Sequence, residues 1–358
     1  MEQIYDSRHS GQDVDDAVDA VRTTIPSQLT QIGSELDKKL ESDEGGIGDL
    51  DIADGNGNVL ARFYNGHIKT KYFDSSQINI GERKLKICVI GNSYSCDSFM
   101  YVPFILKNYG IDIELGIYYR GGASLQNQID EWLTGNSSSF YYIDTTTMTA
   151  WTASSNATPY NAVRYKQWDI VVIQQSSTDS VTASTFQAAR ELEELILDNV
   201  GRTIVFGWNI NINRASSGSD YTAIANTILD NIEATCKREP IDIIFPYGTA
   251  IFNARTNATL DAIGAGGDLW ASDKVHLQEG LPCYIAALAN VQALFNRYYP
   301  QFSVMNDTTR PTAANITAWN VQGQNGSSVG VTEANCRLAQ ICAVLANKFN
   351  FEITTIYG

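Results

Sequence analysis

Apolar residues recur at helical spacing near the start of the chain, within residues 12–42. Intervals of three or four positions place them on one narrow face of a helix. Pro26 interrupts the pattern, so we expect a break there, with Pro26 in the first turn of a second helix. Such a helix must pack on another domain or self-associate as a short bundle. The residues on this face are Val14, Val18, Val21, Ile25, Leu29, Ile32, Leu36 and Leu40.

Two short apolar runs follow, at 50–53 and 59–63, and they flank the sequence Asp54–Gly55–Asn56–Gly57. Asp-Gly and Asn-Gly are strong signals for a tight turn, so these runs predict a β-hairpin. Residues 1–83 are therefore predicted to form a small helical and β-hairpin module that docks or oligomerises.

From Lys84 onward, β-rich apolar runs alternate with helical ones, which predicts an α/β fold with helices on both faces of a five-stranded parallel sheet. The segment 140–160, rich in Tyr, Thr and Ser, is expected to be a hairpin or loop over one end of the sheet. Residues 84–358 form one predicted domain, with a core at 84–300 and a C-terminal extension at 301–358. The expected strands are 85–90, 111–119, 169–173, 203–208 and 241–245, and the expected helices are 94–109, 125–133, 183–197, 223–236, 282–297 and 333–349.

Composition narrows the class of protein. Of 358 residues, 44% are apolar, which is enough for a sizeable core and excludes wholesale disorder. The net charge is −15 and no basic patch is evident, so we expect no nucleic-acid partner. No apolar run reaches the roughly 18 residues of a membrane span, so we expect no membrane insertion. The first residues lack the basic and apolar regions of a signal peptide, which predicts synthesis in the cytoplasm without secretion.

Cysteine and histidine usage limits the possible chemistry. The six cysteines contain no C-x-x-C pair, so we expect buried free thiols and neither a metal nor another cofactor. There are three histidines, His9, His67 and His276. Any mechanism that needs a histidine base must use one of these three.

Ligands of parallel α/β sheets bind at the carboxyl ends of the strands, so the candidate chemistry lies there. The first predicted strand is followed by Gly91–Asn92–Ser93–Tyr94–Ser95–Cys96–Asp97. A serine at a strand-to-helix turn is well placed to act as a nucleophile. The same sequence would also make an ordinary turn and helix cap.

The next two strands end in small or amide residues. Arg120–Gly121–Gly122–Ala123–Ser124 follows the second strand, where glycine lets backbone N–H groups approach a ligand. Gln174–Gln175–Ser176–Ser177 follows the third, where a side-chain amide can donate to an oxyanion. Both stretches are also compatible with ordinary turns whose polar groups satisfy the backbone.

A carboxylate and an imidazole stand three residues apart in Asp273–Lys274–Val275–His276. On one loop, the carboxylate can orient the imidazole and stabilise its protonated form. His9 lies in a polar segment and His67 follows the predicted hairpin. His276 is therefore the candidate base.

Together the blocks GNSYS, GGASL, IQQSS and DKVHL resemble the SGNH hydrolases, the GDSL-like lipase and acylhydrolase superfamily, and in particular a branch common in gut Bacteroidetes. The resemblance covers roughly residues 84–300. It implies a three-layer α/β/α flavodoxin-like fold and ester hydrolysis without a metal. By position, Ser93 would be the nucleophile, His276 the general base and then acid, and Asp273 the orienting carboxylate.

The same resemblance implies an oxyanion hole made by the backbone N–H groups of Ser93 and Gly122 and by a side-chain amide. Gln175 is the best substitute for the family's usual Asn, with Gln174 or Thr178 as alternatives. Asn92 also departs from the family pattern, which usually has Asp before the serine.

We expect the substrate to be a short-chain ester, acetyl above all, carried by a carbohydrate. Aromatic rings suit sugar faces, and the 140–160 segment, Trp208 and Trp270 offer such rings. Several of these rings could equally belong to the core. A catalytically inactive glycan-binding or structural protein on the same fold is the alternative. The expected substrate-binding residues are Asn92, Tyr94, Gln174, Trp208 and Trp270.

The stretch DIADGNGNVLARFYNGHIKTKYFDS, residues 51–75, resembles segments of tail-fibre and tail-spike proteins of phages and prophages that infect Bacteroidetes. This resemblance implies a virion component that trimerises or joins a phage tail through residues 1–83, with an enzyme domain that trims surface glycans.

Overall fold

The computed structural model describes residues 50–53, 59–64, 67–70, 84–200, 204–213, 221–261, 269–321 and 329–357. The helices predicted within residues 12–42 lie outside this part of the chain, and so does the turn at 54–57. A three-stranded sheet has the order β1-β2-β3. Two of its strands occur where the hairpin was expected, and a third follows them; docking or oligomerisation through this module stays a prediction. The strands are β1 (Leu50–Ala53), β2 (Val59–Tyr64) and β3 (His67–Thr70).

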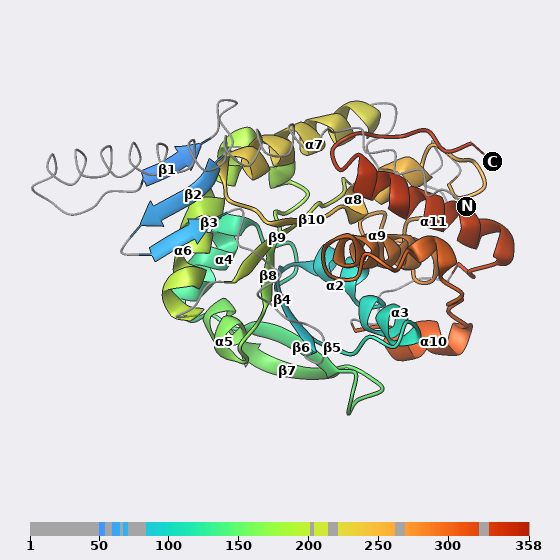
Figure 1. Ribbon diagram of the computed structural model, residues 1–358, viewed down its shortest axis with the longest axis horizontal. Coiled ribbons are helices and arrows are strands. Elements are labelled where there is room, and N and C mark those ends of the chain that lie inside the picture. Colours follow the sequence, from blue (N-terminus) through green and yellow to red (C-terminus); the bar gives the residue numbers. More distant parts are fainter. Residues whose placement is uncertain are drawn as a thin grey trace, which may run out of the picture. The chain divides into compact units, whose positions relative to one another are not determined.

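A second sheet has seven strands in the order β10-β9-β8-β4-β5-β6-β7 (Figure 1). The strands from β10 to β5 are parallel to one another, whereas β6 and β7 are antiparallel to their neighbours. The sheet is thus mixed and larger than predicted, because the segment 140–160 extends its edge instead of covering its end. Its strands are β4 (Leu85–Gly91), β5 (Ile113–Tyr119), β6 (Ser138–Asp144), β7 (Thr152–Ala157), β8 (Ile170–Ile173), β9 (Val205–Asn209) and β10 (Ile243–Phe245).

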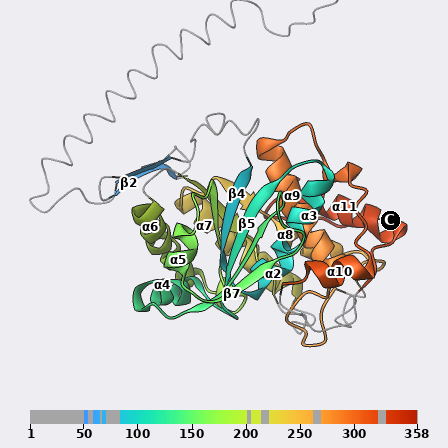
Figure 2. The same cartoon turned by 90° about the horizontal axis from the view of Figure 1, so that it is seen from below.

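Helices form a layer on each side of this sheet (Figure 2). One layer contains α2 (Ser93–Phe99), α3 (Val102–Asn108), α8 (Tyr247–Ala254), α9 (Leu281–Tyr298) and α11 (Glu333–Lys348). The other contains α4 (Leu125–Thr134), α5 (Pro159–Arg164), α6 (Ala188–Val200) and α7 (Tyr221–Arg238). The arrangement has three α/β/α layers, and its parallel strands have the flavodoxin-like order.

The single helix predicted at 94–109 is two helices, α2 and α3. Pro103 lies in the first turn of α3, where a missing backbone N–H costs nothing, and the chain turns at Met100 and Tyr101 between the helices. The sequence pattern also missed α5, α8 and α10 (Ala313–Trp319). These helices are short, and a short apolar run has too little periodicity to distinguish helix from strand.

The core lies on both faces of the central strands, since every residue of β8 and β9 is buried. Continuous apolar runs are typical of parallel strands covered on both sides. All six cysteines are free and buried, as predicted. Among the described residues, no helix is long and apolar enough to cross a membrane.

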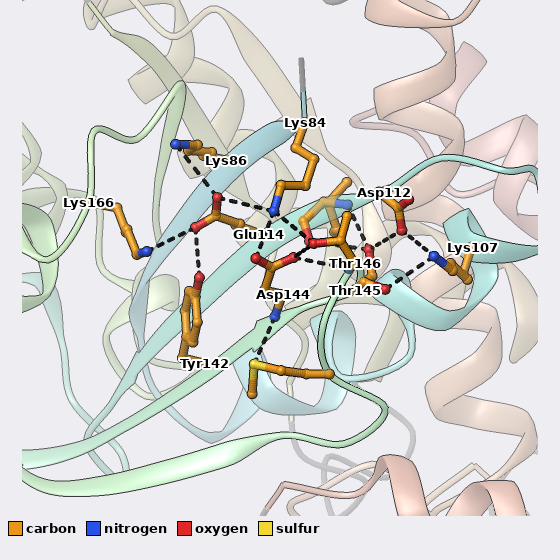
Figure 3. Close-up of polar contacts among 12 residues, drawn as sticks. Lys84, Lys86, Lys107, Asp112, Glu114, Tyr142, Asp144, Thr145, Thr146 and Lys166 are labelled. Atoms are coloured by element: carbon orange, nitrogen blue, oxygen red, sulfur yellow. Dashed lines mark hydrogen bonds and ion pairs between the residues drawn. The ribbon is translucent and has the colours of Figure 1, made fainter. Parts of the chain in front are cut away.

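An ionic cluster at the amino ends of β4 and β5 holds the edge hairpin β6–β7 on the sheet (Figure 3). Tyr142 of β6 donates to the Glu114 carboxylate at 2.7 Å, and Lys84 donates to Asp144 at 2.7 Å. Burial alone would raise the pKa of Glu114, but the Tyr142 hydrogen bond and neighbouring ammonium groups lower it. This cluster lies at the opposite end of the strands from the motifs predicted to carry chemistry. The ammonium groups 3.4–3.6 Å from Glu114 are those of Lys84, Lys86 and Lys166.

Candidate active site

Three loops meet at the carboxyl ends of β4, β5 and β8. This is the switch point of the strand order, because β5 lies on one side of β4 and β8 lies on the other. Asn92 joins them. Its Nδ2 donates to the backbone oxygen of Ala123 at 3.0 Å and to that of Gln175 at 3.3 Å. Its Oδ1 caps α2 by accepting from the N–H of Tyr94 at 3.1 Å. Such a switch point is where open α/β sheets bind ligands.

Ser93 is the first residue of α2, and 5% of its surface is exposed. Within the described part of the chain, neither its hydroxyl nor its backbone N–H makes a hydrogen bond. The N–H of exposed Gly122 is likewise unbonded among these residues. Gly122 has a left-handed backbone with φ of 67°, which glycine adopts without strain. These are the two backbone donors that the sequence predicted for the oxyanion hole.

Asp273 and His276 are directly bonded, with 2.5 Å between Oδ2 and Nδ1. The other carboxylate oxygen of Asp273 accepts from the backbone N–H groups of Val275 and His276 at 2.9 and 3.0 Å. This is the local turn that aspartate readily forms with its own backbone. Because Nδ1 is held by Asp273, the imidazole has Nε2 left for a reacting group.

The loop that carries this pair is a small closed hairpin. Trp270 and Leu277 form an antiparallel bridge across it, and Lys274 at its tip has a φ of 58°. The loop leads into α9, which packs against α2 (Figure 1). Helix packing therefore fixes where the Asp273–His276 pair lies relative to the helix that begins with Ser93.

Two contacts place His276 beside the first turns of α2. The rings of Tyr94 and His276 have centroids 6.1 Å apart. The Asp97 carboxylate accepts from the backbone N–H of Leu277, the residue after His276, at 3.0 Å. No hydrogen bond joins Ser93 to His276 within the described residues.

The two carboxyl groups near His276 have opposite electrostatic environments. Partial burial of Asp273 opposes ionisation, but the Val275 N–H and the His276 imidazole outweigh it and lower the pKa of Asp273. Asp97 is fully buried, and this burial raises its pKa to about 7 despite the attraction of His276. Asp273 is thus the carboxylate that remains ionised over the widest pH range.

The side-chain amides of Gln174 and Gln175 both bond to other residues, and the assignment of Gln175 to the oxyanion hole stays a prediction. Nε2 of Gln175 donates to the backbone oxygen and hydroxyl of Thr185, both at 3.2 Å. Nε2 of Gln174 donates to the Tyr247 hydroxyl at 3.2 Å, and its oxygen accepts from the Ser95 hydroxyl. Thr178, the other alternative to Gln175 as the side-chain donor of the oxyanion hole, is exposed. Gln175 also supports the loops, since its Oε1 accepts from the N–H groups of Leu125 and Ser176.

The side chains expected to bind substrate are buried, so that expectation needs correction. Trp208 and Gln174 have no exposed surface. Asn92 joins three loops, and the side chains of Tyr94 and Trp270 face the interior, with 3% and 2% of these residues exposed. A sugar cannot stack on a ring that has no solvent-facing surface. The groups that do reach solvent here include His276, whose side chain is 24% exposed, Asp273, whose side chain is 47% exposed, and the Gly121–Gly122 turn.

Asp97 is the residue of this site that the sequence analysis left without a role. The signal in the sequence was a carboxylate four positions after Ser93, and the structure shows that all seven residues of this helix are buried. Such a position normally takes an apolar side chain. In the described part of the chain, no group of three or more His, Cys, Asp or Glu side chains could hold a metal ion.

The fold and site together define a class: a three-layer α/β protein with Ser, His and Asp presented at the carboxyl edge of its parallel strands. Among solved structures, the chain is similar to a DUF4886 family protein from Bacteroides uniformis, with a TM-score of 0.61 and 22% identity over 76% of this chain and 98% of that one. At this identity the likeness concerns the fold.

Two further structures match less closely. A candidate SGNH hydrolase from Slackia heliotrinireducens is 16% identical, with a TM-score of 0.40 over 59% of this chain and all of that one. A candidate acylhydrolase from Bacteroides fragilis is 14% identical, with a TM-score of 0.36 over 64% of this chain and 98% of that one. No family model and no curated protein matches the chain.

Proposed function

We propose that the protein is a serine esterase that hydrolyses short-chain acyl esters. One observation carries the proposal: the bonded Asp273–His276 pair lies beside the first turns of the helix that begins with Ser93. A carboxylate that fixes one imidazole nitrogen leaves the other to act as a base, which is the arrangement that activates a serine hydroxyl.

In the proposed reaction, the Ser93 hydroxyl attacks the ester carbonyl while Nε2 of His276 takes its proton. The N–H groups of Ser93 and Gly122 stabilise the negative charge on the carbonyl oxygen. The ester C–O bond then breaks, and the protonated His276 gives its proton to the departing alcohol. A water molecule, deprotonated by His276, next attacks the acyl-serine, which releases the carboxylic acid and regenerates Ser93.

A polar acyl acceptor is supported by a hollow beside the oxyanion loop. The hollow has a volume of about 390 Å³ and begins at Ser124, two residues after Gly122. Six of its eight lining residues carry a hydroxyl or an amide group, which suit the hydroxyl groups of a carbohydrate. None of the large apolar side chains that are exposed among the described residues lines this hollow, so a fatty acyl chain finds no support there. The lining residues are Ser124, Gln126, Gln175, Asp179, Ser184, Thr185, Gln187 and Ala188.

The test compares wild type with Ser93→Ala on p-nitrophenyl acetate, p-nitrophenyl octanoate and an acetylated oligosaccharide. We expect wild type to prefer the acetyl esters, and Ser93→Ala to lose at least about 10³-fold in kcat with an unchanged melting temperature. Hydrolysis by Ser93→Ala at the wild-type rate would overturn the nucleophile assignment. Faster turnover of octanoate than acetate would overturn the short-chain assignment.

A glycan-binding protein without catalysis is the second candidate, and one observation favours it: Nε2 of Gln175 directs both of its hydrogen bonds to Thr185, which competes with a third oxyanion contact. A fluorophosphonate probe separates the two, because it labels a serine that a base activates. Labelling of wild type but not of Ser93→Ala supports the esterase. Unlabelled wild type that binds acetylated oligosaccharides supports the binding protein.

A further inference from the structure

We propose that Asp97 is a positioning residue for the histidine: its carboxylate fastens the His276 loop to α2 and adds a second negative charge near the imidazole. The inference rests on the proposed esterase function and assigns a role to a residue outside the Ser93–His276–Asp273 set.

The fastening is a hydrogen bond between segments far apart in the chain. Asp97 lies one helical turn after Ser93, and its Oδ2 accepts from the N–H of Leu277 at 3.0 Å. Leu277 follows His276 directly, and its bridge to Trp270 closes the loop that holds Asp273. A displacement of Leu277 would therefore move the imidazole relative to the Ser93 hydroxyl.

The acidic character of Asp97 needs a separate explanation, because an amide would accept the same hydrogen bond. Asp97 has no exposed surface, and its Oδ1 has no hydrogen-bond partner among the described residues. A carboxylate in such a place destabilises the folded protein unless a nearby positive charge compensates for the lost hydration. His276 supplies that charge at the moment it takes the proton from Ser93.

The groups around Asp97 leave His276 as its cationic partner. His276 attracts the Asp97 charge, whereas Asp273 and Glu279 on the same loop repel it. Neutral groups on the other elements complete the surroundings, and burial keeps them protonated by raising their pKa values. These groups are Cys283 of α9, Tyr101 between α2 and α3, Tyr119 of β5 and Tyr247 of α8.

The experiment measures the pH profile of kcat/KM for wild type, Asp97→Asn and Asp97→Ala on p-nitrophenyl acetate. Asp97→Asn keeps an acceptor for the Leu277 N–H but removes the charge. We expect it to fold and to lose about tenfold in kcat/KM, with the loss largest above about pH 7, where Asp97 of the wild type is ionised and stabilises the positive charge that forms on His276. Asp97→Ala also removes the acceptor, so we expect a loss of about 10²-fold.

Asp307→Asn is the matched control. Asp307 is also a buried acid whose pKa burial raises, but it is bonded to Tyr284 and Thr309 instead of the His276 loop. We expect Asp307→Asn to change the melting temperature but to have the same pH profile of kcat/KM as the wild type.

If Asp97→Asn has the same kcat/KM and the same pH profile as the wild type, the electrostatic part of the proposal is overturned. If Asp97→Ala folds and keeps wild-type kcat/KM, the positioning part fails as well. If Asp97→Ala does not fold, the Asp97→Asn profile still decides. Ser93→Ala in the same assay separates these results from failure of the esterase proposal, since residual hydrolysis there would point away from Ser93 altogether.

Discussion

Asn92 is the residue through which the loops of the site are joined, and its amide suits this role better than a carboxylate would. It gives two N–H bonds to backbone carbonyl oxygens, those of Ala123 and Gln175. It accepts one bond from Tyr94. A carboxylate can accept but cannot donate. Asn92 stands where the resembled family usually has Asp, and the two carbonyl oxygens that need a donor explain why an amide suits this position.

We predict that Asn92→Asp lowers the free energy of unfolding by about 2–4 kcal/mol, because it loses two donors and places a charge against two carbonyl oxygens in a buried site. Chemical denaturation would measure this change. Asn315→Asp is the control. The Asn315 oxygen caps α10 by accepting from Thr312, a role that Asp keeps, so little change is expected. Equal stability of Asn92→Asp and wild type would contradict the joining role.

At the scale of elements, the junction between β4 and α2 sets the direction in which Ser93 leaves the sheet. Gly91 ends the strand, and a Cβ at this position would lie 2.0 Å from the Ser95 hydroxyl and 3.1 Å from the Gln174 amide oxygen. Ser95 and Gln174 are themselves hydrogen bonded. Strand and helix can therefore approach this closely only with glycine at 91.

Gly91→Ala should lower the free energy of unfolding by about 1–3 kcal/mol and reduce the proposed esterase activity, because α2 must move away from the added methyl group. Adding Ser95→Ala removes the nearest clashing atom, so we expect the double variant to be more stable than the sum of the single changes by about 1 kcal/mol. Gly330→Ala, where an added Cβ meets open space, serves as the control. Strictly additive effects would mean that the clash is relieved in another way.

For the whole molecule, buried acids determine how stability changes with pH. Burial raises the pKa of Asp97 to about 7 and also raises the pKa values of Glu279 and Asp307. The folded protein keeps protons on these groups that the unfolded chain releases above roughly pH 4. The folded state thus binds more protons, and stability falls as pH rises. Acids with lowered pKa values, such as Asp273, act below about pH 4 and do not reverse this trend.

The melting temperature is therefore expected to decrease between pH 5 and pH 8, with repulsion among the excess acidic groups of this −15 chain adding to the decrease. Thermal unfolding at low and high salt would separate the two causes, because salt screens surface repulsion more than it changes buried acids. Asp97→Asn should reduce the decrease of the melting temperature with pH that persists at high salt. A melting temperature that rises steadily to pH 8 would contradict this explanation.

Much of the fold could be predicted because its signals are local. β8 is a continuous apolar run and β4 is apolar apart from Lys86, a pattern typical of buried strands. Ser93, Gly122 and the Asp273–His276 pair follow recognisable turns. The edge strands β6 and β7 were harder, since the Tyr- and Ser-rich 140–160 segment has few fully buried residues and its pairing with β5 is a tertiary choice.

The sequence by itself determined which residues stand at the ends of the parallel strands and which histidine has a carboxylate three positions before it, because spacing along the chain encodes both. Tertiary structure decided what each polar group is free to do. Gln175 has the right chemistry for an oxyanion donor, but its amide is held by Thr185. Trp208 has a suitable ring, but the core covers it. Asp97 acquires its partner only because α9 packs on α2 and brings Leu277 within 3.0 Å. Hydrogen-bond partners and burial depend on segments that the local pattern does not connect.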